Sequence, residues 1–128
     1  MTGKFDFWQD HSEQFLLMAH LWEKRMALAN PDGVGSKTGN CGDTITMYLS
    51  VEKGVVAQLT FELSGCINTN ACSNAVAVLV EGKTLEQCWN VSPADVIDFL
   101  ETLPEDHHHC AELAVGTLYL ALADCVKY

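Results

Sequence analysis

Hydrophobic residues recur at three- and four-residue spacing near the N-terminus and at two-residue spacing in the middle of the chain. The first pattern predicts a helix over residues 12–29, capped by Ser12 and stopped at Asn30-Pro31-Asp32-Gly33. The helix would present an apolar stripe of Phe15, Met18, Ala19, Trp22 and Met26. The second pattern predicts two strands joined at Glu52-Lys53-Gly54, a β-hairpin with one buried face.

The apolar positions of the hairpin 44–63 alternate with polar ones along both predicted strands. They are Ile45, Met47, Leu49 and Val51 on the first strand, and Val55, Ala57, Leu59, Phe61 and Leu63 on the second. An isolated hairpin is only marginally stable, so we expect helices to cover its apolar face. The preceding stretch 34–43 is rich in Gly and small polar residues and is interpreted as a loop.

Three further helices are predicted after the hairpin. One runs from just after Cys66 to about Val80, and Gly82 provides its stop signal. A short helix opens at Ser92-Pro93 and ends near Leu100. The last runs from near His109 to about Cys125. This order predicts a single α+β domain over residues 1–128, with a small antiparallel sheet, open to a third strand, packed against N- and C-terminal helices.

Composition places the chain among ordinary soluble globular proteins. Of its 128 residues, 48% are hydrophobic and 19% charged, and no apolar run reaches the length of a membrane-spanning helix. The first residues, Met1-Thr2-Gly3-Lys4-Phe5-Asp6, lack the basic and apolar regions of a signal peptide. We therefore expect a cytoplasmic protein.

The net charge of −10 argues against nucleic acid and anionic membranes as partners, because the seven basic residues are few and scattered. A nucleotide site is also rejected. The run Gly33–Thr38 lacks the first glycine of a phosphate-binding loop and leads into a strand rather than a helix. In a reducing cytoplasm, the six cysteines are expected to be buried, catalytic or metal-bound rather than paired in disulfides.

Three of the cysteines fall where predicted elements begin or end. The local sequences are Asn40-Cys41-Gly42-Asp43, Ser64-Gly65-Cys66 and His109-Cys110. Two of these thiols lie at a predicted helix N-terminus, where backbone amides favour the thiolate, which is the form that binds metals. Because no CxxC pair is present, the spacing by itself is equally compatible with three unrelated buried thiols.

Asp43 strengthens the metal hypothesis, because Gly42 permits a tight turn that would direct a thiolate and a carboxylate to one ion. A mixed set of soft and hard ligands should hold a metal cluster less firmly than four thiolates. His109, next to Cys110, is the one histidine we nominate as a ligand. We assign His107 and His108 to a solvated loop, and Cys72, Cys88 and Cys125 to the core.

Together these pieces resemble one family in order and spacing over residues 30–128. They are Cys-Gly-Asp before a strand, Gly-Cys opening a helix, Gly82-Lys83-Thr84-Leu85, and His-Cys before the last helix. The resemblance is to the IscU / NifU N-terminal type of iron–sulfur cluster assembly scaffold. It implies a scaffold rather than a turnover enzyme, on which a transient [2Fe-2S] cluster is built and passed to recipient apo-proteins.

The resemblance also implies the site and its partners. Cys41, Cys66 and Cys110, with Asp43 and His109, would hold the nascent cluster. A cysteine desulfurase would deliver sulfur as a persulfide to Cys110, a second partner would donate iron, and zinc can occupy the same residues. The alternatives are a zinc-containing sulfur acceptor that serves a desulfurase, and an interaction domain whose cysteines are merely packed.

The chain departs from the family pattern at three places. The segment from Pro31 to Cys41 is shorter than usual. Leu103-Pro104 is followed by Glu105-Asp106 instead of the Pro-Val-Lys of the family's chaperone motif, which argues against recognition by its Hsp70-type chaperone. The interval from Cys66 to Cys110 leaves no room for the insertion of the zinc-dependent sulfur-transfer branch, which favours the scaffold branch.

Overall fold

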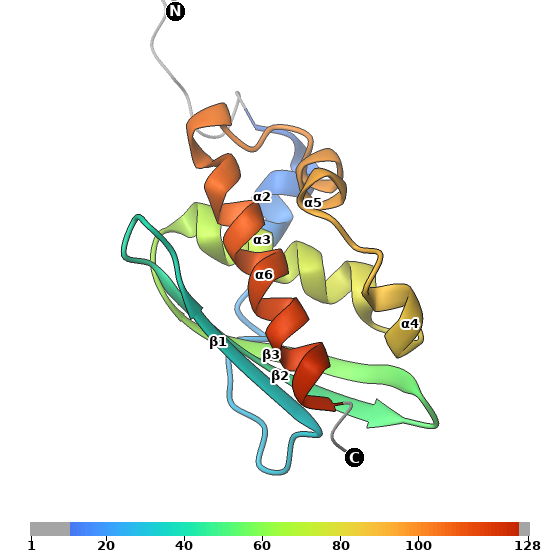
Figure 1. The fold of residues 1–128 in the computed structure, drawn as a ribbon. Helices are drawn as coiled ribbons and strands as arrows, with labels where there is room; N and C mark the ends of the chain where they lie inside the picture. Colours follow the sequence, from blue (N-terminus) through green and yellow to red (C-terminus); the bar gives the residue numbers. More distant parts are fainter. Residues whose placement is uncertain (1–10, 126–128) are drawn as a thin grey trace, which may run out of the picture.

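The computed structural model describes residues 11–125 as a three-stranded antiparallel sheet covered by helices (Figure 1). The strand order β1-β2-β3 confirms the predicted α+β class and supplies the third strand. Within this part of the chain, no helix combines the length and apolar character needed to cross a membrane. The elements are α2 (Glu13–His20), β1 (Gly33–Thr38), β2 (Thr44–Glu52), β3 (Val55–Ser64), α3 (Ile67–Val80), α4 (Leu85–Cys88), α5 (Pro93–Leu100), the 3-10 helix η1 (Glu105–His107) and α6 (His108–Cys125).

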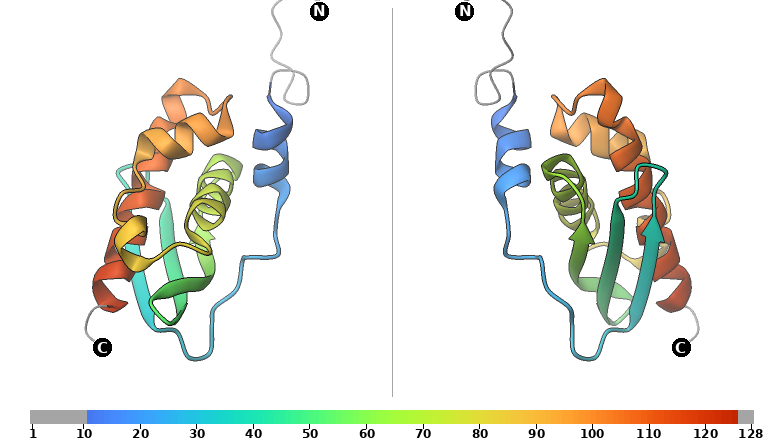
Figure 2. Two further views of the ribbon diagram at one scale, coloured as in Figure 1. Left: turned by 90° about the vertical axis from the view of Figure 1, so that its right-hand side faces the viewer. Right: turned by 90° about the vertical axis from the view of Figure 1, so that its left-hand side faces the viewer.

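The helices form layers beside the sheet (Figure 2). Helix α6 packs along β1 and β2, α3 packs against β3 and α6, and α2 packs on α3. The core between them is apolar, and its largest members are Phe15, Ile45, Met47, Leu49, Leu59, Phe61, Leu100, Leu118 and Leu122. Hydroxyl pairs line the exposed side of the sheet, where Ser36 contacts Thr46 and Thr38 contacts Thr44, each at 2.9 Å.

The β2–β3 hairpin forms as predicted, with Glu52 paired to Val55 across a two-residue turn. Lys53 and Gly54 have φ values of 53° and 78°, and a type I′ turn requires this sign at both positions. The predicted inward set is confirmed for β2, where Ile45, Met47 and Leu49 are buried and Val51 is half-buried against the core.

A register shift changes the inward set at the start of β3. Gln58 pairs with Ser50, but Val56 pairs with Val51, so Ala57 is an extra residue in β3. Such a bulge reverses the alternation of side chains beyond it. Val56 is therefore buried in place of Val55 and Ala57, and the sequence-based assignment of those two residues to the buried face is wrong.

Residues 33–38 form strand β1, so the loop predicted over 34–43 is wrong for its first half. The glycines of this stretch serve helix–strand packing. A Cβ atom at Gly33 would lie 2.3 Å from the Cys125 sulfur, and one at Gly35 would lie 2.4 Å from the Ala121 nitrogen. Glycine at both positions therefore allows α6 to approach the backbone of β1. The short segment between Pro31 and Cys41 therefore consists mostly of strand β1.

The N-terminal helix is shorter than predicted. Ser12 caps it as expected and accepts a hydrogen bond from the backbone nitrogen of Phe15 at 3.1 Å. The helix ends at His20, however, and Leu21 is extended. Trp22 and Met26, predicted to continue the apolar stripe, are 58% and 46% exposed. The helix prediction over 21–29 is therefore wrong, although Leu, Glu, Lys, Arg and Met are good helix formers.

The residues after α2 cover the outer edge of β3 instead of continuing the helix. The Phe61 nitrogen donates to the Lys24 carbonyl at 2.9 Å, and the Leu59 nitrogen donates to the Glu81 carboxylate at 3.0 Å. Lys24 and Glu81 also form an ion pair with a separation of 2.6 Å. Farther along, the Val56 nitrogen donates to the Lys83 carbonyl at 2.9 Å. Backbone groups of this edge strand thus find partners, which removes sites for pairing with another chain.

The other predicted helices are confirmed. Helix α3 extends to Val80, and Gly82 follows it with φ of 87°. Helix α5 opens with a capping box between Ser92 and Asp95. The one-turn helix α4, which the sequence analysis did not predict, begins at a second capping box between Thr84 and Gln87.

Candidate metal centre

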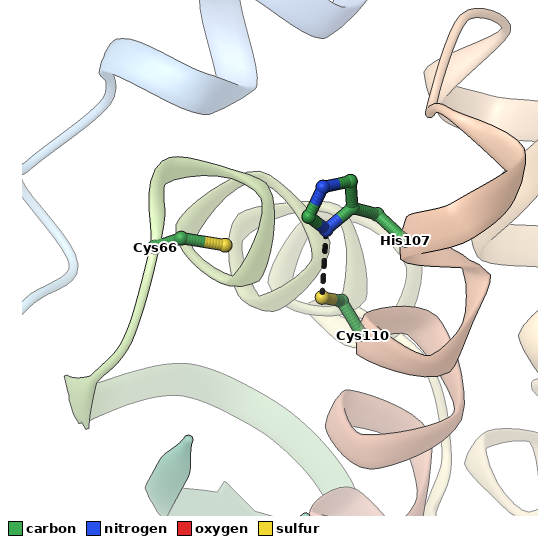
Figure 3. A group of neighbouring side chains, drawn as sticks. All are labelled: Cys66, His107 and Cys110. Atoms are coloured by element: carbon green, nitrogen blue, oxygen red, sulfur yellow. Dashed lines mark hydrogen bonds between the residues drawn. The ribbon is translucent and has the colours of Figure 1, made fainter. Parts of the chain in front are cut away.

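Two thiols and an imidazole converge where α3 and α6 begin (Figure 3). Cys66 is the N-cap residue of α3, His107 ends η1, and Cys110 lies in the first turn of α6. One ligand atom from each of the three lies within 4.8 Å of the others. The Cys110 sulfur is 4.0 Å from Nδ1 of His107, toward which it points in Figure 3. The fold therefore brings two of the three predicted cysteines to one place.

His107 was assigned to a solvated loop, yet it is half-buried and belongs to this group. Its spacing of three residues from Cys110 was the available signal, because residues three apart share one face of a helical turn. The nominated ligand His109 is exposed, with Nε2 3.7 Å from the Cys110 sulfur. The two imidazole centroids are 5.8 Å apart. Both histidines thus flank Cys110.

Cys41 lies in the tight turn between β1 and β2. The Gly39 nitrogen donates to the Asp43 carbonyl at 2.8 Å, which leaves a three-residue loop of Asn40, Cys41 and Gly42. Gly42 has φ of 91°, the left-handed conformation that closes such a loop. Cys41 is exposed and lies outside the group formed by Cys66, His107 and Cys110.

Asp43 reaches the thiols through Thr69. The Thr69 hydroxyl donates to Oδ2 of Asp43 at 2.5 Å and lies 3.6 Å from the Cys66 sulfur and 3.5 Å from the Cys110 sulfur. Gly65 makes room for the carboxylate, because a Cβ atom there would lie 2.6 Å from Oδ2. The sequence analysis singled out Asp43 but missed Thr69, because no pattern in the sequence marks a hydroxyl in the first turn of a helix as part of a site.

The two central thiols differ in their readiness to ionise. Burial opposes ionisation of Cys66, but hydrogen bonds from the backbone of Thr69, from its hydroxyl and from the backbone of Asn68 together lower the Cys66 pKa. This agrees with the expectation for a thiol at a helix N-terminus. Burial raises the pKa of Cys110 to about 11, and Cys66, Asp43 and Cys41 add to the rise, against the effect of the Thr69 hydroxyl. For Cys110 the expectation of a favoured thiolate is therefore wrong.

The remaining cysteines are in the core, as predicted. Cys72, Cys88 and Cys125 are buried, and burial raises the pKa of each thiol. None of the three belongs to the group formed by Cys66, His107 and Cys110. The chemistry of the centre is that of soft sulfur and borderline nitrogen donors, with a hard carboxylate nearby, a combination suited to iron or zinc.

Residues 24–127 match the family model described as the NifU-like N-terminal domain. The chain is 32% identical over 99 residues to an iron-sulfur cluster assembly scaffold protein IscU of Archaeoglobus fulgidus, a match that covers 76% of this chain and 64% of the relative. It is 30% identical over 109 residues to the scaffold protein IscU of Escherichia coli K12, covering 74% of this chain and 84% of the relative. The chain thus spans less than two thirds of the archaeal relative's length.

Two solved structures share the fold. An N-terminal NifU-like protein of Brucella abortus superposes with a TM-score of 0.74 at 20% identity, covering 91% of this chain and 94% of that one. A protein of Fervidobacterium islandicum, described as a putative scaffold for the SUF system, gives a TM-score of 0.73 at 19% identity, covering 91% and 99%. At these identities the likeness concerns the arrangement of helices and strands.

Proposed function

Because the chain belongs to the family of NifU-like N-terminal domains, we propose that it is a scaffold for a transient [2Fe-2S] cluster. The cluster is assembled from iron and desulfurase-derived sulfur and then passed to recipient apo-proteins. The relatives are named as scaffolds, so the role proposed is that of an assembly surface rather than of a turnover enzyme. We place this work in the cytoplasm, where thiols are kept reduced.

The observation that carries the proposal is the convergence of Cys66, His107 and Cys110 within 4.8 Å of one another. Three potential ligands from two helix N-termini are more than the packing of isolated thiols requires, so the interaction-domain alternative has less support. Cys41 and Asp43 lie on the adjacent turn and complete the set. A movement of this turn toward α3 and α6 would add both residues to the site. Little packing opposes such a movement, because the turn 39–43 is exposed for most of its length.

The mixed ligand set supports release as well as assembly. Two iron atoms bound by thiolates, an imidazole and a carboxylate are held less firmly than by four thiolates, because carboxylate is a hard ligand for a soft cluster. This weakness would be a disadvantage in a permanent electron carrier and an advantage in a protein that gives its cluster away.

The first sulfur acceptor is better assigned to Cys66 than to Cys110. The resemblance implied Cys110, but that side chain is only 1% exposed, whereas Cys66 is exposed. The Cys66 thiolate would attack the terminal sulfur of the desulfurase persulfide, that sulfur–sulfur bond would break, and the desulfurase cysteine would leave as a thiolate. Cys110 is close enough to receive the sulfur from Cys66.

A transfer experiment tests the proposed function. The protein is incubated anaerobically with ferrous iron, cysteine, a cysteine desulfurase and a thiol reductant that converts persulfide sulfur to sulfide, and an apo-ferredoxin that takes a [2Fe-2S] cluster is then added. We expect visible charge-transfer absorption to develop on this protein and then to appear on the ferredoxin, and Cys88→Ala to behave the same way. A chromophore that never forms, or never leaves, would overturn the scaffold proposal.

The second candidate is a zinc-containing sulfur acceptor for the desulfurase. The observation that favours it is His107, because two cysteines and a histidine are common zinc ligands. Metal analysis before and after turnover separates the candidates. Stoichiometric zinc that persists while a Cys66 persulfide is trapped by alkylation, with no cluster formed, would favour this second function.

A further inference from the structure

Thr69 is the point of contact between the carboxylate and the thiols of the centre. It lies in the first turn of α3 and is fully buried. Its hydroxyl oxygen has three neighbours, Oδ2 of Asp43 at 2.5 Å and the sulfurs of Cys110 and Cys66 at 3.5 Å and 3.6 Å. A fully buried hydroxyl among three candidate ligands is positioned to act on the ligands themselves.

The hydroxyl carries one hydrogen, which it can donate either to Asp43 or to one of the two sulfurs, and the distances favour Asp43 while the carboxylate is in place. A carboxylate accepts a stronger and shorter hydrogen bond than a thiol does, and the contact with Asp43 is shorter than either sulfur contact by about 1 Å or more. The oxygen of Thr69 therefore separates the carboxylate from the sulfurs. This agrees with the composition of the ligand group, which contains Cys66, His107 and Cys110 but not Asp43.

The backbone of the same turn completes a seat for the carboxylate. Gly65 precedes the N-cap residue Cys66, and a Cβ atom at Gly65 would lie 2.6 Å from Oδ2 and 2.8 Å from Cγ of Asp43. Gly65 and Thr69 thus hold the Asp43 side chain from two sides.

We propose that Thr69 is a positioning residue that holds Asp43 out of the ligand set until its hydrogen bond to the carboxylate is broken. The inference rests on the proposed function and adds an order of ligand recruitment, in which the sulfur and imidazole ligands bind first and the carboxylate last. The hydrogen bond to the seated carboxylate then opposes ligation by Asp43, so removing the hydroxyl should strengthen metal binding.

The test is a titration of the reduced apo-protein with Co²⁺, whose absorption reports thiolate ligation directly. Thr69→Val replaces the hydroxyl with a methyl group of similar size. We expect T69V to bind Co²⁺ about tenfold more tightly than the wild type, the effect of one hydrogen bond to a charged group. Thr69→Ser keeps the hydroxyl and should bind as the wild type does.

A double-mutant cycle separates Asp43 from every other effect of the substitution, including the loss of the contacts with the sulfurs. In the Asp43→Ala background, T69V should give no gain in Co²⁺ affinity, because the carboxylate that Thr69 restrains is gone. Equal affinity of T69V and the wild type, weaker binding by T69V, or the same gain in the D43A background would each overturn the inference.

Gly65→Ala provides a second route that leaves Thr69 intact. The added methyl group occupies the seat of the carboxylate, so G65A should also raise Co²⁺ affinity, and again only when Asp43 is present. Thermal unfolding of each variant checks that it is folded. If the wild type shows thiolate-to-cobalt absorption but the Co²⁺ affinities show no coupling between Thr69 and Asp43, this inference alone is wrong. If the wild type shows no such absorption, the proposed metal site is wrong as well.

Discussion

The amide nitrogen of Asn74 in α3 lies 2.8 Å from the carbonyl oxygen of Met18 in the last turn of α2. The same nitrogen lies 2.9 Å from the Leu21 carbonyl, and the Asn70 amide donates to the Ala19 and Leu21 carbonyls at 3.0 Å and 3.2 Å. The last carbonyls of a helix have no partner within it. Here two asparagine side chains of α3 donate to those carbonyls, and α2 therefore ends where it contacts α3.

We predict that Asn74→Ala destabilises the protein by about 1–3 kcal/mol, because the buried Met18 carbonyl loses its side-chain donor and the Leu21 carbonyl keeps only Asn70. Urea unfolding measures the change, and hydrogen exchange should show faster opening of α2 than of α6. Asn90→Ala, at an exposed position, is the matched control and should change stability by less than about 0.5 kcal/mol. Equal effects of the two substitutions would contradict the assigned role of Asn74.

The ion pair beside β3 leads to a second prediction. Glu81 accepts from both Lys24 and the Leu59 nitrogen, so Glu81→Ala should cost about 1–3 kcal/mol and leave the edge of β3 without this partner. Glu81→Gln retains a carbonyl oxygen for Leu59 and should lose less. Urea unfolding with light scattering reports both effects. Greater loss of stability in E81Q than in E81A would show that the backbone contact is unimportant.

These two contacts also explain where sequence reasoning about the fold stopped. Two-residue periodicity predicted β2 and most of β3, and cap and stop signals beside apolar segments predicted α3, α5 and α6. The apolar stripe extended the first helix to residue 29, because the partners that end α2, Asn70 and Asn74, are about 50 residues away in the sequence. Strand β1 was hidden for a similar reason. Its glycines are typical of a loop, and their role in the strand is evident only from the close approach of α6.

The candidate site was predictable to the extent that its residues flank secondary-structure elements. Cys66 and Cys110 come together because both begin helices that pack on each other, and Asp43 lies within reach on the neighbouring turn. Thr69 was missed because its part depends on side-chain positions in three dimensions, whereas His107 had a signal in its three-residue spacing from Cys110. The pKa of Cys110 was also misjudged, because the sequence places it at a helix N-terminus but does not show how deeply it is buried.

Close packing between β1 and α6 gives a third prediction. Gly35→Ala places a methyl carbon 2.4 Å from the Ala121 nitrogen and 2.8 Å from the Leu120 carbonyl carbon, so the helix must move. We expect a loss of more than about 3 kcal/mol, at the upper end of overpacking effects. Ser36→Ala, on the exposed neighbouring residue, should cost less than about 1 kcal/mol. Thermal or urea unfolding decides, and a Gly35→Ala variant as stable as Ser36→Ala would contradict the packing.

Thiol reactivity supplies the fourth prediction. The lowered pKa of Cys66 and its exposure favour rapid alkylation near neutral pH, whereas Cys110 is buried with a pKa of about 11. A raised pKa keeps the sulfur of Cys110 as the unreactive thiol, and the fraction of thiolate rises about tenfold per pH unit below the pKa. The alkylation rate of Cys110 should therefore rise about tenfold per pH unit until the pH approaches 11. Pulsed iodoacetamide labelling read by mass spectrometry follows each site. Buried Cys88 reports global opening and should stay unlabelled while Cys66 reacts; equal rates for Cys66 and Cys110 at pH 7 would contradict the structure.

The most direct test of the central claim is the visible absorption of two anaerobically reconstituted variants. One carries Cys→Ala at positions 41, 66 and 110, and the other carries Cys→Ala at the core positions 88 and 125. Both are incubated with ferrous iron, cysteine, a desulfurase and a thiol reductant under the same conditions. The account predicts wild-type charge-transfer absorption in the core variant and none in the site variant. The same chromophore in the variant lacking Cys41, Cys66 and Cys110 would show that the cluster is built elsewhere.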